Sequence, residues 1–129
     1  MLNDPLANVM SHILNCEKKG KNECLVKPDS KLVRQILTLL KTTEYIKNFE
    51  VLEERRGGLI KVELSGSING CGVVKPRFSV KRNGYEKYEK RFLPAANFGF
   101  LVVSTSRGVV VHKEAIKNNL GGKLLAYCY

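Results

Sequence analysis

The chain has 129 residues, and its 22 lysines and arginines outnumber its 12 aspartates and glutamates, for a formal net charge of +10. This length allows one domain or two small modules, since domains most often run to about 100–150 residues. A hydrophobic content of 43% excludes a disordered basic tail. No apolar run approaches the ~20 residues of a membrane helix, and the opening residues lack the pattern of a signal peptide. The composition therefore predicts a soluble, cytoplasmic protein.

The first predicted element is an amphipathic helix that begins at Asp4-Pro5, an N-cap carboxylate followed by a proline at the first helical position. Lys18-Lys19-Gly20 ends it, with cations at the negative helix end and a glycine for a left-handed cap. The buried face is predicted from apolar residues spaced i, i+3, i+4, i+7 and i+8. These residues are Leu6, Val9, Met10, Ile13 and Leu14.

A short strand, a second helix and a hairpin complete the first half of the chain. Cys24-Leu25-Val26 is the strand, and Ser30 is the expected N-cap of the second helix. Two further strands, over Phe49–Glu54 and Leu59–Leu64, flank the turn Arg55-Arg56-Gly57-Gly58. The first half therefore has the order α-β-α-β-β, with two helices able to cover one face of a small sheet.

The segment Ser65–Gly70 is small and polar, and we take it as the boundary between modules 1–65 and 66–129. The second half is rich in strand-forming residues and in glycine, so we expect a mostly β module with one short helix, and an α+β protein as a whole. The polar stretch 85–91 receives no predicted element. The predicted elements are strands over 98–103 and 109–111, a turn at 105–108, a short helix over about 113–120 and a last strand over 124–129.

The net charge is unevenly divided between the two halves. Residues 1–65 hold 11 basic and 9 acidic residues, a net +2, whereas residues 66–129 hold 11 basic and 3 acidic residues, a net +8. A segment this basic attracts polyanions, and nucleic acid is the favoured partner. An anionic membrane surface is the alternative, but it would require a basic amphipathic helix with exposed aromatic residues.

The cysteines give no support for a metal centre or for disulfides. Cys16, Cys24, Cys71 and Cys128 are separated by 8, 47 and 57 positions, so no pair has the two-to-four-residue spacing of zinc sites. Disulfides are rare in a chain without an export signal. The sequence therefore predicts no metal and no cofactor, with all four cysteines acting as small hydrophobic residues.

A run of hydroxyl side chains is the main candidate for ligand recognition. Ser104, Thr105 and Ser106 are followed by Arg107 and Gly108 at the tip of the predicted hairpin, in the basic half. Such a loop could bind the 2′-hydroxyls and exposed bases of RNA, with Arg107 on a phosphate. The alternative is ordinary turn chemistry, because serine, threonine and glycine are common turn residues.

Two further motifs each have a structural and a functional interpretation. Gly121-Gly122 before Lys123 would cap the short helix, and the second glycine also indicates a close approach to the backbone, by the hairpin loop or by a nucleic acid. Ser30-Lys31 would begin a helix with an exposed cation, or else present a phosphate site at that helix end.

Two functions of other classes are alternatives to RNA binding. A hydrolase could use Ser104 or Ser106 with His112, but it would also need an acidic residue to orient the histidine. Glu114 is not expected to orient the histidine, because it should face outward in the first turn of the helix, where its charge interacts favourably with the helix dipole. A protein-interaction adaptor would instead use the first helix and an exposed strand edge.

Several of these motifs together resemble one family of ribosomal proteins. The loop Ser104–Gly108, the segment His112–Ala115 and the run Gly121–Leu125 are similar to the signature of the small-subunit ribosomal protein family numbered eight. Asp4–Ala7 and Pro28–Lys31 agree with the same family, so the resemblance covers essentially the whole chain. Phe92-Leu93-Pro94 and the pair Gly122-Lys123 resemble its archaeal and eukaryotic branch, since an acidic residue would be expected at position 123 in the bacterial branch.

The resemblance implies a non-catalytic structural constituent of the small ribosomal subunit. Its relatives bind an irregular helix in the central domain of the small-subunit rRNA and help assembly, beside neighbouring small-subunit proteins, in the cytoplasm. No membrane is implied, and the free protein would be a monomer. The residues that the resemblance places on RNA are Ser104, Thr105, Ser106, Arg107, Gly108, Gly121, Gly122, Lys123, Ser30 and Lys31.

Overall fold

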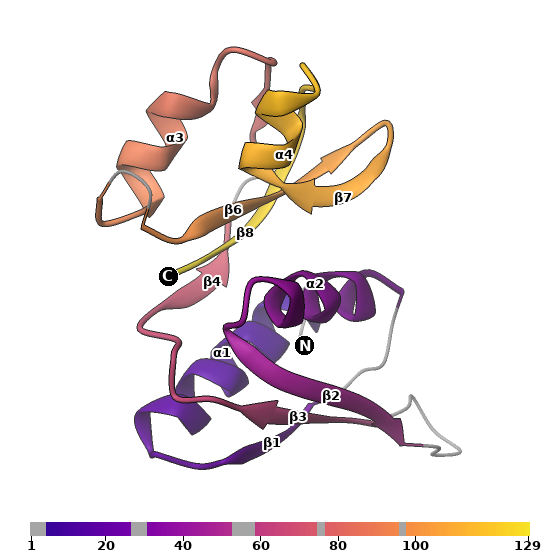
Figure 1. The fold of residues 1–129 in the computed structure, drawn as a ribbon, viewed down its shortest axis with the longest axis vertical. Helices are drawn as coiled ribbons and strands as arrows, with labels where there is room; N and C mark the ends of the chain where they lie inside the picture. The colour runs from indigo at the N-terminus through magenta and orange to yellow at the C-terminus, as the bar shows by residue number, and fades with distance from the viewer. Residues whose placement is uncertain (1–4, 27–30, 53–58, 75–76, 96–97) are drawn as a thin grey trace. The chain divides into compact units, whose positions relative to one another are not determined.

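A computed structural model describes residues 5–26, 31–52, 59–74, 77–95 and 98–129 of the chain (Figure 1). The chain divides into two compact units, Met1–Asn69 and Gly70–Tyr129, and each unit contains its own antiparallel sheet. The predicted α+β class is confirmed. None of the described helices is both long enough and apolar enough to cross a lipid bilayer.

The first unit has the predicted order α-β-α-β-β. Its sheet has the strand order β1-β3-β2, so the last strand of the unit lies in the middle. The expected turn at residues 55–58 and the expected caps at Asp4 and Ser30 lie outside the described residues. The elements are α1 (Pro5–Lys18), β1 (Glu23–Val26), α2 (Lys31–Thr42), β2 (Ile46–Leu52) and β3 (Leu59–Leu64).

Both helices of this unit cover the same face of its sheet, as Figure 1 shows. On β3 the buried residues Ile60, Val62 and Leu64 alternate with half-buried ones, which is the period of a strand with one covered face. The predicted apolar stripe of α1 is buried except for Leu14, which is half-buried. Gly20 takes the left-handed conformation at the end of α1, with φ 71°, as predicted.

The segment after β3 is attached to the first unit by a carboxylate. The backbone N–H groups of Gly66 and Ile68 donate to the two carboxylate oxygens of Glu17, at 3.3 and 3.0 Å. Glu17 belongs to the last turn of α1. One side chain therefore holds the polar segment against the helix before the second unit begins.

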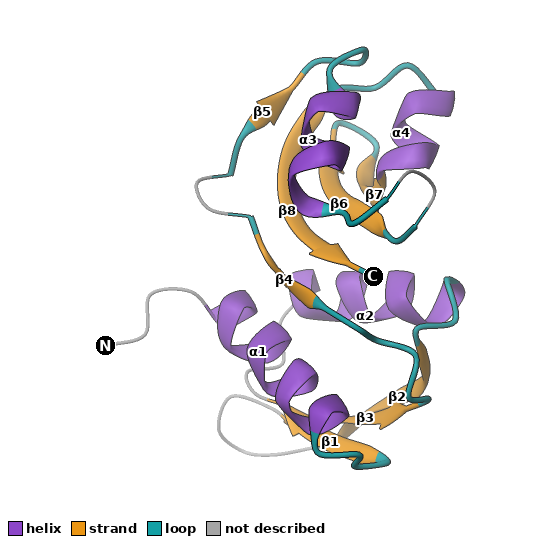
Figure 2. Ribbon diagram, turned by 90° about the vertical axis from the view of Figure 1, so that its left-hand side faces the viewer, coloured by secondary structure: helices purple, strands orange, loops and turns teal. Residues whose placement is uncertain are grey.

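The second unit is built around its last strand (Figure 2). Strand β8 pairs with β4 and β5 on one side and with β6 on the other, and β7 pairs with the far side of β6. All these pairs are antiparallel. The elements are β4 (Cys71–Val73), β5 (Ser79–Val80), α3 (Tyr85–Phe92), β6 (Phe100–Thr105), β7 (Gly108–Val111), α4 (His112–Lys117) and β8 (Gly122–Cys128).

This unit contains one more helix than the sequence predicted. Helix α3 covers the polar stretch to which no element was assigned, because most of its residues are charged. Tyr85, Tyr88 and Phe92 nevertheless recur at i, i+3 and i+7, and they form or pack against the core with Leu101 and Leu124. That spacing of aromatic residues was the available signal for a helix.

The end of α4 differs from the prediction. We expected Gly121-Gly122 to cap this helix, but it ends at Lys117 and Asn119 takes the left-handed conformation, with φ 57°. The N–H of Leu120 then donates to the carbonyl of Ala115 at 2.8 Å, which completes a Schellman cap. Asparagine can adopt this conformation because its short polar side chain costs little there. The cap of α4 therefore does not involve Gly121 or Gly122.

Candidate nucleic-acid interface

The hydroxyl loop, Ser104–Gly108, forms the tip of the β6–β7 hairpin. Thr105 pairs with Gly108, which leaves Ser106 and Arg107 as a two-residue turn. Gly108 has a φ of 111°, a backbone conformation that favours glycine. The predicted hairpin turn is therefore confirmed. Its tip is exposed, and the paired strands below it are rich in β-branched residues.

The three hydroxyls of this loop have different environments. The Thr105 hydroxyl donates to the carbonyl of Gly108 at 2.8 Å and accepts the N–H of Arg107 at 3.1 Å, so it holds the turn together. Ser104 and Ser106 are exposed, and no described protein group engages their hydroxyls. Thr105 is therefore placed to fix the loop, and the two serines are placed to contact a ligand.

An exposed row of polar residues crosses three strands beside this loop. Lys123 of β8 pairs with Ser104 of β6 on one side and with Ser79 of β5 on the other. Directly opposed residues in antiparallel strands point to the same face, and all three are exposed. Sequence reasoning missed Ser79. The available signal was its place between the apolar residues Phe78 and Val80, an alternation that predicts an outward-facing strand position.

Gly121 and Gly122 allow the backbones to approach closely at this edge. A Cβ on Gly122 would collide with the carbonyl oxygen of Ser104, and one on Gly121 would lie 2.6 Å from the carbonyl oxygen of Val80. A close approach to the backbone of the second glycine, Gly122, was expected, and strand β6 of the hairpin makes it. Without it, Lys123 could not pair with Ser104 in the exposed row.

The charge of this edge is entirely positive. Residues 77–84, 100–111 and 118–125 include no aspartate or glutamate. Arg107 and Lys123 are exposed beside the hydroxyl loop, and exposed Lys81 and Arg82 lie next to Gly121. Short hydroxyls surrounded by cations suit a polyanion that carries hydrogen-bonding groups as well as charge.

The other predicted cation lies in the first unit. Lys31 is the first residue of α2 and is exposed, whereas Ser30 lies outside the described residues. The structure thus brings together the hydroxyl loop, Gly121, Gly122 and Lys123 within one unit. Lys31 is a separate feature of the other unit.

His112 is engaged in a buried network and not with the serines. Its Nδ1 accepts the N–H of Leu101 at 3.0 Å, and its Nε2 lies 2.9 Å from a carboxylate oxygen of Glu89. An acceptor at Nδ1 requires the neutral ring with its proton on Nε2. Burial lowers the pKa of His112 below its usual range, although Glu89 opposes this. Glu89 is an acidic residue of the kind the hydrolase would need, but both ring nitrogens of His112 are occupied, by the Leu101 N–H and by Glu89, so neither can accept a proton from Ser104 or Ser106.

Short hydroxyls, closely approached glycine backbone and exposed cations on one sheet form the kind of surface that nucleic-acid-binding proteins use. The model of one family, ribosomal protein S8, matches residues 4–129. The chain belongs to this family, which consists of non-enzymatic structural proteins of the small ribosomal subunit that bind rRNA. The predicted family and the predicted lack of enzymatic activity are confirmed.

Proposed function

We propose that this chain binds directly to an irregular helix in the central domain of the small-subunit rRNA and helps the subunit to assemble in the cytoplasm. The observation that carries the proposal is the exposed row of Ser79, Lys123 and Ser104 beside the hydroxyl loop. It supports specific recognition because hydroxyls distinguish hydrogen-bonding partners, whereas cations alone attract any polyanion.

An irregular RNA helix is the target that such a surface fits. The major groove of regular A-form RNA is too deep and narrow for side chains, so sequence is recognised where bases are displaced in bulges and internal loops. Ser104 and Ser106 are short and lose little side-chain entropy on contact. The Thr105 hydroxyl keeps the backbone between them in one conformation. The loop is thereby preorganised for a displaced base.

Cations around the loop supply the affinity that is independent of sequence. Arg107 and Lys123 are placed to contact phosphates near the recognised bases, and Lys31, with Ser30, is proposed to contact the sugar–phosphate backbone from the first unit. Each neutralised phosphate releases counterions, so binding weakens as salt rises.

We further propose that the chain is of the archaeal and eukaryotic type within its family. The supporting residues are Phe92-Leu93-Pro94 and the lysine at position 123. Lys123 stands in the exposed row beside Ser104, where an acidic residue would repel a phosphate. The free protein is proposed to be a monomer that contacts neighbouring small-subunit proteins once the subunit forms.

The test is the combined substitution of Ser104 and Ser106 by alanine. We expect at least a tenfold loss of affinity for the cognate rRNA fragment and little change for a random duplex of equal length. Replacing exposed Ser11 of α1 by alanine is the matched control, and it should leave both affinities unchanged. Equal losses on the two RNAs would show that the hydroxyls do not contribute to specificity.

A further inference from the structure

Three side chains that can bind a metal ion lie together in the first unit. His12 and Cys16 are four residues apart on α1, and Cys24 projects from β1. Their ligand atoms all lie within 4.8 Å of one another, and the Cys16 sulfur is 3.9 Å from Nε2 of His12. We call these three residues the donor cluster.

Local backbone structure accounts for this arrangement. Residues i and i+4 of a helix share a face, so the side chains of His12 and Cys16 are neighbours on the same side of α1, one turn apart. After the left-handed Gly20, the N–H of Lys21 donates to the carbonyl of Cys16 at 3.0 Å and the chain turns back along the helix. The alternation of β1 then directs Cys24 inward. Neither element is distorted to bring the three donors together.

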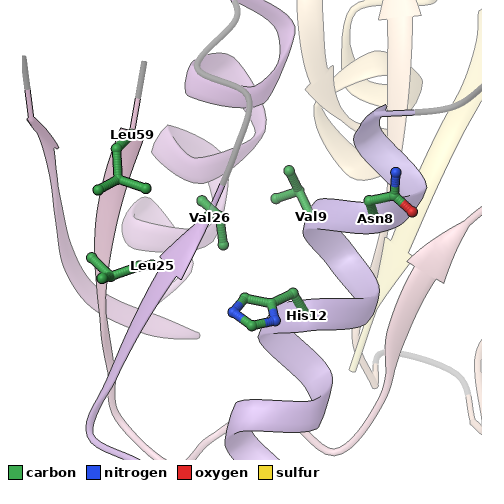
Figure 3. A pocket seen from close by; sticks show the side chains of 6 residues that line it. All are labelled: Asn8, Val9, His12, Leu25, Val26 and Leu59. Carbon is green, nitrogen blue, oxygen red and sulfur yellow. The ribbon is translucent and has the colours of Figure 1, made fainter. Parts of the chain in front are cut away.

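The donor cluster opens into a cavity. A cavity of about 350 Å³ is lined by His12, Cys16, Cys24 and by Lys21, Glu23 and Leu25. A second cavity, of about 450 Å³, is also lined by His12, and Figure 3 shows His12 extending from α1 toward the strand that carries Leu25 and Val26. The two cysteines are buried and His12 is exposed. An ion can therefore reach the thiols, and the imidazole has space to move.

We propose that His12, Cys16 and Cys24 bind a zinc ion, with water as the fourth ligand. Two thiolates and one imidazole form a ligand set that selects zinc over the hard cations, and three protein ligands with one open position are a common arrangement for it. Tetrahedral bonds of about 2.0–2.3 Å place ligand atoms roughly 3.5–3.8 Å apart. The Cys16 sulfur and Nε2 of His12 are already 3.9 Å apart, and because all three ligand atoms lie within 4.8 Å of one another, shifts of at most about 1 Å give this spacing.

The bond-forming step requires both thiols to lose their protons to solvent. Burial, together with the neighbouring Cys16, raises the pKa of Cys24 to about 12, so the metal-free protein holds a neutral thiol there. As each sulfur–zinc bond forms, the sulfur supplies its electron pair and the proton passes to the buffer. No oxidant or reductant is involved. The charge of Lys21 favours the thiolate form of Cys24.

Zinc at this place would connect the last turns of α1 to the edge strand of the sheet. An ion that binds the folded protein and not the unfolded chain raises the free energy of unfolding by RT ln(1 + [L]/Kd), where [L] is the concentration of free ion. The proposal thus predicts a first unit that resists unfolding better when zinc is present. It does not depend on RNA binding, and its test uses the full chain without RNA.

The experiment is a titration of the reduced full-length chain with Co²⁺ under anaerobic conditions, followed by Zn²⁺. We expect one equivalent of Co²⁺ to produce thiolate-to-cobalt charge-transfer absorption and the intense visible bands of a tetrahedral site. Zn²⁺ should then abolish both. A spectrum that contains only the weak bands of octahedral Co²⁺, at saturation and with the thiols titrated as fully reduced, would overturn the proposal.

Variants assign the signal to the donor cluster. His12→Ala should weaken Co²⁺ binding at least tenfold without unfolding the protein, because His12 is exposed. Cys24→Ala should weaken Co²⁺ binding and lower the charge-transfer absorption, because one of the two thiolates is lost, and Cys71→Ala, which removes a buried cysteine of the other unit, should leave both unchanged. Should Cys24→Ala fail to fold, His12→Ala decides alone. Unchanged affinity in His12→Ala, or loss of absorption in Cys71→Ala, would exclude this site.

Discussion

The two units have the same general construction and different surfaces. Each consists of an antiparallel sheet with two helices, but the residues up to Asn69 carry a net +2 and those from Gly70 a net +8. In the first unit, oppositely charged neighbours such as Lys61 and Glu23 pair across adjacent strands, at 3.4 Å. In the second unit, the hairpin and the strands beside it, residues 77–84, 100–111 and 118–125, include cations and hydroxyls but no acidic residue. Units of similar construction can thus carry surfaces of very different charge.

The largest effect is expected from a side chain at the closest backbone contact of the second unit. Gly122→Val would place a Cβ against the carbonyl of Ser104, where β6 and β8 pair. We expect a loss of about 3 kcal/mol in the free energy of unfolding, the upper range for overpacking, together with loss of RNA binding. Chemical denaturation monitored by circular dichroism measures it. Gly84→Ala, whose Cβ would make only ordinary contacts, should remain within about 1 kcal/mol of the parent protein.

The next effect concerns the buried histidine and depends on pH. The pKa of His112 is lower in the folded protein than its usual value near 6.5. At a pH between these two pKa values, the histidine is protonated in the unfolded chain and neutral in the folded protein. Stability is therefore fully present above pH 6.5 and falls as the pH decreases below it. His112→Gln, which cannot titrate, should flatten this decrease when the two unfolding curves are compared from pH 7 to 5. Parallel curves would contradict the assignment.

A smaller effect should separate the structural hydroxyl of the loop from the recognition hydroxyls. Thr105→Val removes a donor to Gly108 and an acceptor for Arg107, so we expect a loss of about 0.5–1.5 kcal/mol in stability. Ser106→Ala removes an exposed hydroxyl and should change stability by less than about 0.5 kcal/mol. Thermal unfolding and RNA affinity, measured on the same samples, distinguish them. Equal stability losses would refute this division of roles.

The smallest effects are expected from single exposed cations. Arg107→Ala and Lys31→Ala should each make the slope of log affinity against log salt concentration shallower by about one, which corresponds to one phosphate contact. Each should lower the affinity for cognate and random RNA by the same factor. Binding measured at several salt concentrations gives this slope. If Lys31→Ala left it unchanged, the first unit would contribute no phosphate contact at this position.

Much of the fold could be predicted because its signals are local. The stripe of α1, the alternation of β3 and the turn at Thr105–Gly108 each follow from side-chain periodicity or turn chemistry. Helix α3 was missed because its charged residues dominate its composition, and only Tyr85, Tyr88 and Phe92 mark the buried face.

The missing parts of the candidate sites depend on pairing between distant strands. Ser79 and Ser104 are separated by many residues, and only the shared partner Lys123 brings them into one row. In the donor cluster, the spacing between Cys16 and Cys24 matches no zinc motif, and the return of the chain after Gly20 brings them close. Spacing along the chain does not encode such proximity until the topology is known.

The central position of β8 has a consequence for how the protein is made. A ribosome releases the chain from its N-terminus, so β4, β5 and β6 emerge before the strand that joins them. The first unit can complete its sheet as soon as β3 has left the exit tunnel. The second sheet must wait for residues 122–128, and until then its strands present unpaired edges. The surface proposed to recognise RNA is thus assembled last, after synthesis of the segment that carries Lys123.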